Sequence, residues 1–213
     1  MKKIFIILVL LLIGFSNSIY AKELPKSLFG IPLFQKINKW DVTAFNFDEV
    51  VEKNGNKYRW YDITKENVPK PNSEFPKYNF VTNLNGEIVG IFGYNGGDSP
   101  NYNKSPSEYK CTKEKEILIS NLSIFYSIDQ FENVFLIQKG DTGITLGDRS
   151  YLEIKEGNSS FDRFLEIECQ YNFEYYWLIV RLLSKKYHLD SMVNKEIVDF
   201  LDFNFLASDL TGF

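Results

Sequence analysis

Two strand-like runs around a tight turn signal limit the fold of this chain more than any other feature. The runs cover residues 78–83 and 87–95, read YNFVTN and EIVGIFGYN, and flank Leu84-Asn85-Gly86. An Asn-Gly pair between two such runs is the strongest short-range signal for a β-hairpin. We therefore expect antiparallel sheet in this part of the chain.

A second pair of strand-like runs also predicts antiparallel sheet; the runs cover residues 164–171 and 175–187. The first run, FLEIECQY, alternates apolar residues with Glu166, Glu168 and Gln170, so we expect one buried and one solvated face. The second run is apolar on both faces, which is typical of a central strand. The intervening three residues are too few for anything but an antiparallel connection.

The remaining pattern predicts an α+β fold. Further strands are expected at residues 57–64, 133–138, 143–147 and 150–157, and a turn at Asn54-Gly55; helices are expected at residues 33–40, 111–129 and 190–203. Runs of strands followed by helices favour antiparallel sheet with helices packed on one face. We expect a single α+β domain over residues 22–213. A loosely duplicated strand-hairpin-helix unit, with two lobes meeting near residues 129–142, is the open alternative.

The first 21 residues have the parts of a secretory signal peptide. Lys2 and Lys3 precede 12 apolar or small residues from Ile4 to Phe15, and Ala21 provides a small residue at the end. A membrane-spanning helix needs about 20 such residues. We expect cleavage after Ala21, with cleavage after Ser18 or an uncleaved anchor as alternatives. Cleavage leaves 213 − 21 = 192 residues in the periplasm or outside the cell.

The net charge and the composition limit the classes of partner that the protein can bind. The formal charge is −4, and removing a leader with two lysines and no acids shifts it to −6. An acidic protein lacks the basic field that attracts nucleic acid. No second long apolar run occurs, so no membrane span is expected after cleavage. The excess of Lys, Asn, Ile and Phe matches AT-rich codons and suggests a bacterial genome. The expected partner is a small molecule, a peptide or an envelope protein.

Cys111 and Cys169 are the only two cysteines. In an oxidising compartment the pair predicts a disulfide across 169 − 111 = 58 positions, with two buried free thiols as the alternative. Because only one histidine, His188, accompanies them, the chain lacks the ligands of a zinc cluster. We expect neither a metal nor a cofactor.

The triplet Asp141-Thr142-Gly143 resembles the catalytic triplet of aspartic proteases. Such enzymes need two carboxylates that share one proton, and the chain contains no second copy of the triplet. Asp and Gly are also favoured turn residues, and a turn is needed between residues 133–138 and 143–147. We therefore expect a turn and keep Asp141 as a weak catalytic candidate. Glu166 and Glu168 are a further carboxylate pair, which a solvated strand face explains more simply.

A candidate ligand-binding segment follows the hairpin. Residues 95–110 are rich in Gly, Asn, Ser, Pro and Tyr, which is typical of a long surface loop. Aromatic and amide side chains in and before this segment suit a sugar, a peptide or a partner protein; they are Tyr94, Asn95, Asp98, Tyr102 and Asn103. A solvated connector without a binding role is the alternative.

The sequence thus favours a secreted or periplasmic binding or envelope-associated module that is not an enzyme. Two other functions stay open. One is an aspartate-dependent hydrolase that uses Asp141, and the other is a structural or assembly subunit that pairs through an exposed strand.

Overall fold

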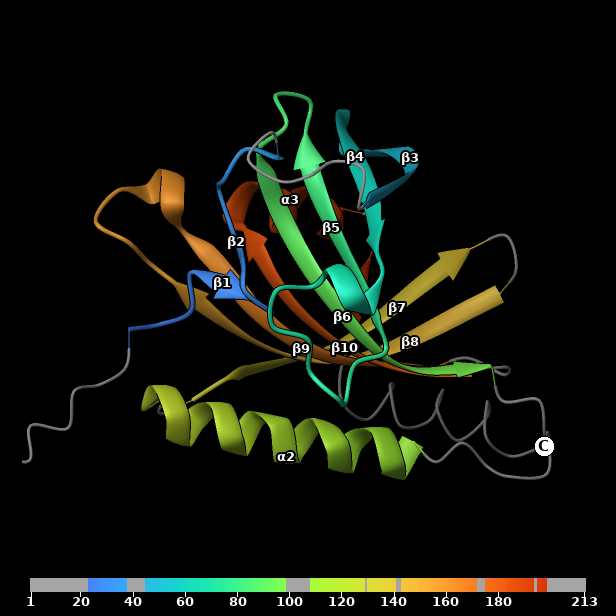
Figure 1. Ribbon diagram of the computed structural model, residues 1–213. Coiled ribbons are helices and arrows are strands. Elements are labelled where there is room, and N and C mark those ends of the chain that lie inside the picture. Colours follow the sequence, from blue (N-terminus) through green and yellow to red (C-terminus); the bar gives the residue numbers. More distant parts are fainter. Residues whose placement is uncertain are drawn as a thin grey trace, which may run out of the picture.

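One nine-stranded antiparallel sheet dominates the structure. The computed structural model describes residues 23–37, 45–98, 108–128, 130–140, 143–171, 175–193 and 195–198. Within these ranges the strand order is β11-β7-β8-β9-β10-β6-β5-β4-β3 (Figure 1). The strands are β3 (Phe45–Lys53), β4 (Asn56–Ile63), β5 (Lys77–Asn83), β6 (Ile88–Asp98), β7 (Glu132–Gly140), β8 (Gly143–Ile154), β9 (Arg163–Tyr171), β10 (Tyr175–Ser184) and β11 (Glu196–Val198).

The sheet joins two four-strand meanders at its centre. Strands β3 to β6 follow one another in the chain and in space, and so do β7 to β10. Strands β6 and β10 then pair antiparallel, with Tyr94 opposite Ile179. Without β11, the strand order is therefore symmetric about this central pair, although the helices do not share the symmetry.

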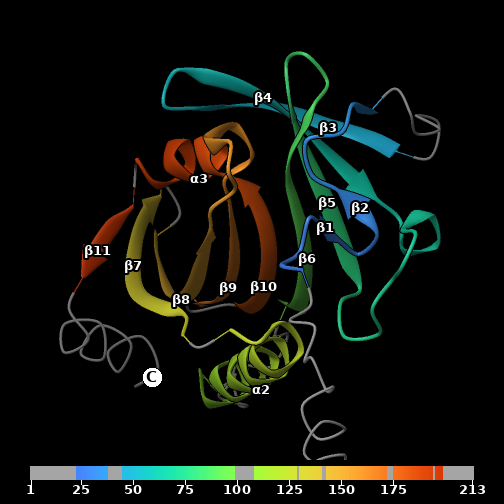
Figure 2. The same ribbon diagram turned by 90° about the vertical axis from the view of Figure 1, so that its left-hand side faces the viewer.

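Two described helices cover the sheet, and they contact opposite faces. The sheet curves into a trough; helix α2 (Glu108–Tyr126) lies outside it, and helix α3 (Lys185–Met192) lies at its open side (Figure 2). Cys111 of α2 bonds to Cys169, whereas His188 of α3 contacts Glu166. Positions 166 and 169 of one strand point to opposite sides. The fold is roughly α+β, as expected, but the expected packing of the helices on one face is not confirmed.

The disulfide between Cys111 and Cys169 is present, and both residues are fully buried. The apolar face of β9 carries Cys169 together with Leu165 and Ile167, which are 1% and 0% exposed. These residues belong to the main core, against which Leu118 and Leu122 of α2 also pack. The link therefore fixes α2 to the middle of the sheet.

Several predicted elements are confirmed. The hairpin is formed by β5 and β6, and Gly86 in its turn has a φ of 75°, a value that only glycine adopts without strain. The helix at residues 111–129 corresponds to α2, and the antiparallel pair at residues 164–187 corresponds to β9 and β10. The Asn54-Gly55 turn joins β3 to β4, with Lys53 opposite Asn56.

Other predictions are wrong in detail. The two strands expected between residues 143 and 157 are one strand, β8, and β6 continues to Asp98, into the segment expected to be a loop. The helix α3 begins at Lys185, earlier than the expected residue 190, and is followed by β11. The rest of the expected helix, from residue 199, lies outside the described residues.

The expected helix at residues 33–40 is also not formed where the structure describes the chain. A small hairpin of β1 (Ser27–Leu28) and β2 (Ile31–Pro32) is followed by Phe34, whose φ is 63°. This left-handed conformation ends any helical continuation, and it is uncommon for a residue with a side chain. Trp40 lies outside the described residues.

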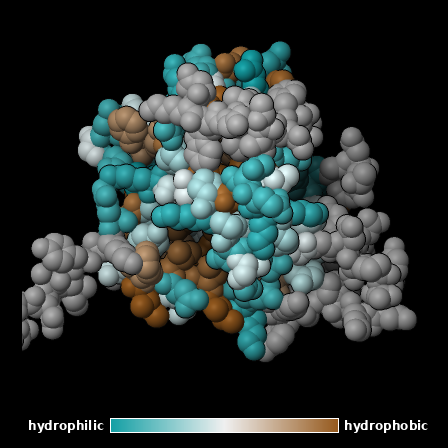
Figure 3. Space-filling model, viewed as in Figure 1, coloured by the Kyte–Doolittle hydropathy of each residue, from teal (hydrophilic) through white to brown (hydrophobic). Residues whose placement is uncertain are grey.

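The outward side of α2 is apolar at three positions. Ile117, Ile124 and Phe125 are 53%, 78% and 50% exposed. Figure 3 shows a brown apolar area low on the molecule, where α2 runs. Neither α2 nor α3, the helices in the described part of the chain, is long and apolar enough to cross a membrane.

Candidate functional site

The inner face of the trough carries a buried group of charges, which we call the ionic cluster: Arg149, Glu166, Glu168, Arg181 and His188. Strand pairing sets Arg149 opposite Glu168 and Arg181 opposite Glu166. Arg149 Nε lies 2.7 Å from Glu168 Oε2, and Arg181 Nη1 lies 3.0 Å from Glu166 Oε2. Both glutamates are at most 1% exposed. The expectation that they lie on a solvated face is therefore wrong.

Helix α3 closes the ionic cluster from the open side of the trough. The His188 imidazole stacks on Phe164 with ring centroids 3.8 Å apart, and its Nδ1 contacts Glu166 Oε1. Met192 at the end of α3 places its sulfur 3.0 Å from Arg149 Nη1. The glutamates are thus shielded from water by the helix that follows β10.

The electrostatics of the ionic cluster favour ionised carboxylates. Burial alone would raise the pKa of the Glu166 carboxyl, but Arg149, the contact with His188, and Arg181 outweigh it and lower this pKa to about 2. Burial opposes Arg149 and Arg181 in the same way at Glu168, whose pKa is well below its ordinary value. Neither carboxyl holds a proton at neutral pH. The geometry suits a structural role for this pair better than acid catalysis.

A small cavity lies beside the ionic cluster on the same face of the sheet, and we call it the sheet cavity. Its volume is about 290 Å³, and its lining consists of Lys77, Asn79, Tyr94, Gln170, Trp177 and Ile179. Lys77 Nζ lies 4.7 Å from the centroid of the Trp177 ring, and Gln170 Nε2 donates to Glu168 Oε1 at 2.9 Å. The volume of the sheet cavity is just below the ~300–1,000 Å³ that is typical of ligand pockets.

A larger cavity opens between the N-terminal hairpin and the start of β9, and we call it the hairpin cavity. Its volume is about 740 Å³. The lining residues come from three separate segments of the chain: Lys26, Leu33, Phe34, Gln35, Lys36, Glu156, Phe161 and Arg163. Ligand pockets of proteins typically measure about 300–1,000 Å³, so the hairpin cavity has the size of a small-molecule site.

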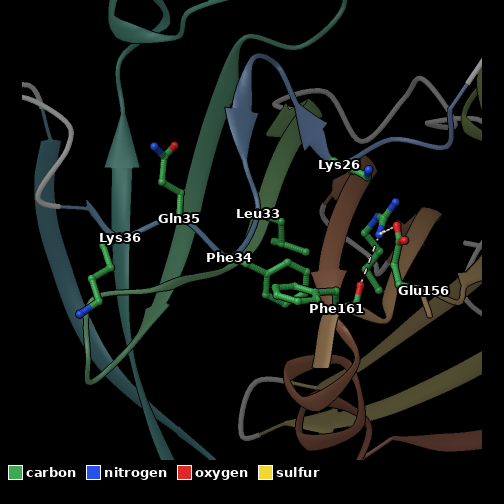
Figure 4. Close-up of a pocket in the computed structure, with 8 residues that line it drawn as sticks. Lys26, Leu33, Phe34, Gln35, Lys36, Glu156 and Phe161 are labelled. Atoms are coloured by element: carbon green, nitrogen blue, oxygen red, sulfur yellow. Dashed lines mark hydrogen bonds and ion pairs between the residues drawn. The ribbon is translucent and has the colours of Figure 1, made fainter. Parts of the chain in front are cut away.

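Two aromatic rings form the centre of the hairpin cavity. Phe34 and Phe161 meet edge to face with their centroids 5.4 Å apart. Phe161 ends a short 3₁₀ helix, η4 (Ser159–Phe161), and is 47% exposed. Figure 4 shows Lys26 and Glu156 on one side of the rings, with Gln35 and Lys36 on the other side and directed away from them.

Backbone hydrogen bonds hold Phe34 in its left-handed conformation. Phe34 N donates to Ile88 O at 2.8 Å, and Ile88 N donates to Gln35 O at 2.9 Å. Ile37 N donates to Gly86 O at 2.8 Å, so the segment is attached to the turn between β5 and β6. A left-handed residue with a side chain costs about 1–3 kcal/mol, and such strain clusters at functional sites. Phe29, Asn54 and Ser127 have the same left-handed conformation outside the cavity, so the strain at Phe34 is secondary to the size and lining of the hairpin cavity.

A buried arginine supports the opposite wall. Arg163 is 2% exposed and donates from Nε to Pro25 O at 2.6 Å and from Nη1 to Glu156 Oε1 at 2.6 Å. Weaker bonds reach Phe161 O and Leu24 O, both at 3.3 Å. Arg163 therefore binds the N-terminal segment and η4 to β9, and fixes the distance across the cavity.

The residues predicted from the sequence do not form one site. Tyr94 lines the sheet cavity, where burial raises the pKa of its hydroxyl. Asn95 is the next residue of β6, so its side chain points to the other face. Asp98 ends β6, and its side chain is not described; Tyr102 and Asn103 lie outside the described residues.

Asp141 also lies outside the described residues, between β7 and β8, which pair up to Gly140 and Gly143. In the described part of the chain no group of three or more His, Cys, Asp or Glu residues is arranged to hold a metal ion.

Sequence reasoning missed Arg149, Arg181 and the whole hairpin cavity. One signal was available, because Arg181 interrupts the apolar run of a central strand, and a charge there requires a buried partner. Comparison of the chain with protein-family models, with curated proteins and with solved structures found no match.

Proposed function

We propose that the protein is an exported binding module whose ligand occupies the hairpin cavity. The observation that carries the proposal is an open cavity of about 740 Å³ in which a half-exposed Phe161 meets Phe34 edge to face. Aromatic rings left accessible in a concave site are typical of binding pockets. The leader-like first 21 residues support export, and the disulfide is compatible with an oxidising compartment.

The ionic cluster supports binding rather than hydrolysis as the function. Glu166 and Glu168, the carboxylate pair that the sequence suggested, are both buried and paired with arginines. A general acid or base must reach a proton of the substrate. In this arrangement the cluster keeps the walls of the trough rigid and attaches α3 to them.

Strand β3 supports assembly as a second candidate function. It is nine residues long, stands at one end of the sheet, and pairs among the described strands with β4 alone. Val50 on this strand is 51% exposed. Long edge strands are templates for pairing with another chain, although the bulge between Phe47 and Glu49 makes this edge less regular. Sedimentation that shows only monomers at high concentration would remove self-assembly through this edge.

The proposed binding function is tested with N-phenyl-1-naphthylamine, an uncharged aromatic probe that fluoresces in apolar sites. The wild-type protein is expected to bind it saturably. Phe161→Ala removes one of the two rings and should weaken binding about tenfold, given the ~0.5–1.5 kcal/mol of an aromatic pair and the apolar area lost with it.

The matched control is Leu189→Ala, which shortens an apolar residue of α3 that is 55% exposed and does not line the cavity. This variant should bind the probe as the wild type does. Equal affinities of the wild type and Phe161→Ala would show that the probe does not occupy the hairpin cavity. No saturable binding by the wild type would count against the proposed function itself.

A further inference from the structure

We infer that the ligand of the hairpin cavity is an anionic amphiphile, with an apolar body and one carboxylate, sulfonate or phosphate group. This inference rests on the proposed function and specifies its ligand. The acidic group lies at the Lys26 end of the cavity, and the apolar body lies along Phe34 and Phe161.

The lining of the hairpin cavity carries more positive than negative charges. Lys26, Lys36 and Arg163 carry three positive charges, and Glu156 carries the one negative charge of the lining. When Glu23, the partner of Lys26, is counted as well, the excess is 3 − 2 = 1 positive charge, whereas the chain as a whole has a formal charge of −4. A cationic cavity on an acidic protein attracts an anion to that place rather than to the surface in general.

The existing contacts of these charged side chains indicate which one can bind the anionic group of the ligand. Arg163 uses four of the five N–H groups of a guanidinium in the hydrogen bonds described above, and Glu156 is one of its acceptors. Lys26 pairs instead with Glu23, and both side chains are largely exposed, at 57% and 75%. An exposed ion pair of this kind is weak. An incoming anion can therefore replace Glu23 at Lys26 more easily than it can displace Glu156 from Arg163.

The orientation of the side chains separates the two lysines. Lys26 lies at the same end as Glu156, whereas Lys36 is directed away from the rings (Figure 4). Leu33 lies next to the rings in Figure 4 and is 7% exposed, so the lining beside the rings is also apolar. A molecule that covers Phe34 and Phe161 and carries its charge at one end would place that charge beside Lys26.

The experiment compares two probes that differ by one acidic group. 8-Anilinonaphthalene-1-sulfonate has the same ring system as N-phenyl-1-naphthylamine plus a sulfonate. Lys26→Gln should weaken binding of the sulfonate about threefold to fivefold, the upper range of an exposed ion pair, and leave the uncharged probe within about twofold. Lys26→Arg should keep both affinities. Lys139→Gln, at a lysine that is 72% exposed and does not line the cavity, is the matched control and should change either affinity by less than about twofold.

Each outcome supports or overturns the inference. Sulfonate binding that weakens with added NaCl, while binding of the uncharged probe does not, supports a charge contact. Lys26→Gln with wild-type affinity for both probes overturns the anionic class but leaves the proposed binding function intact. Displacement of the sulfonate probe by inorganic sulfate alone overturns the amphiphile and leaves a simple anion site. Failure of the wild type to bind the uncharged probe is instead a failure of the proposed function.

Discussion

The disulfide gives the most quantitative prediction. Cys111 and Cys169 close a loop of 58 positions between α2 and β9, and both are fully buried. On the chain-entropy relation, closing a loop of this size removes about 14 cal/mol/K from the unfolded chain, which stabilises the fold by about 4 kcal/mol at 25 °C. For a domain of this size, such a loss should lower the melting temperature by about 8–16 °C.

The assay is urea unfolding followed by tryptophan fluorescence. Reduced wild-type protein isolates the covalent link, because both sulfur atoms remain in the core. The double variant Cys111→Ala, Cys169→Ala removes the sulfur atoms as well and should lose somewhat more. A reduced protein that loses less than about 1 kcal/mol would refute the reasoning, since α2 would then be held by packing alone.

Two further predictions concern the ionic cluster. The pKa of Glu166 is lowered to about 2 in the folded protein, whereas it is near 4.5 in the unfolded chain. The ionised carboxylate therefore stabilises the fold fully above pH 4.5, and this stabilisation is lost as the pH falls toward 2. The free energy of unfolding should fall by about 3 kcal/mol over this range. A flat profile between pH 5 and 2 in urea titrations would contradict this, and Glu166→Gln should make the fall smaller while the contribution of Glu168 remains. A Cβ at Gly147 would lie 2.5 Å from Glu168 Oε1, whereas a Cβ at Gly157 has nothing within 4 Å. Gly147→Ala should therefore destabilise the fold by about 1–3 kcal/mol in the same assay and Gly157→Ala should not; equal effects would show that Glu168 moves freely.

The local parts of the fold could be predicted because they depend on residues close together in the sequence. The hairpin of β5 and β6 follows from its turn residues, and the pairing of β9 with β10 follows from the short connection between them. In both cases one physical rule acts within a few residues. The disulfide was expected from the proposed oxidising compartment and from the apolar face that Cys169 shares with Ile167, although its cysteines are 58 positions apart.

The parts that could not be predicted depend on contacts distant in sequence. Alternation showed that Glu166 and Glu168 share a face, but their burial depends on Arg149, Arg181 and the cover provided by α3. The spacing of Leu33 and Ile37 is helical, whereas hydrogen bonds to the turn at residues 86–88 hold that segment in another conformation. Tertiary contacts therefore override local preference at both places, and one of them is the candidate site.

The most direct test of export and of ligand binding is native mass spectrometry of the protein recovered from the periplasm or the culture medium. We expect the mass of residues 22–213 plus the mass of a non-covalently bound ligand. The Leu189→Ala variant should retain this additional mass, and the Phe161→Ala variant should lose it. Recovery of the full 213-residue chain from the cell interior, or a bound mass that Phe161→Ala retains unchanged, would contradict this expectation.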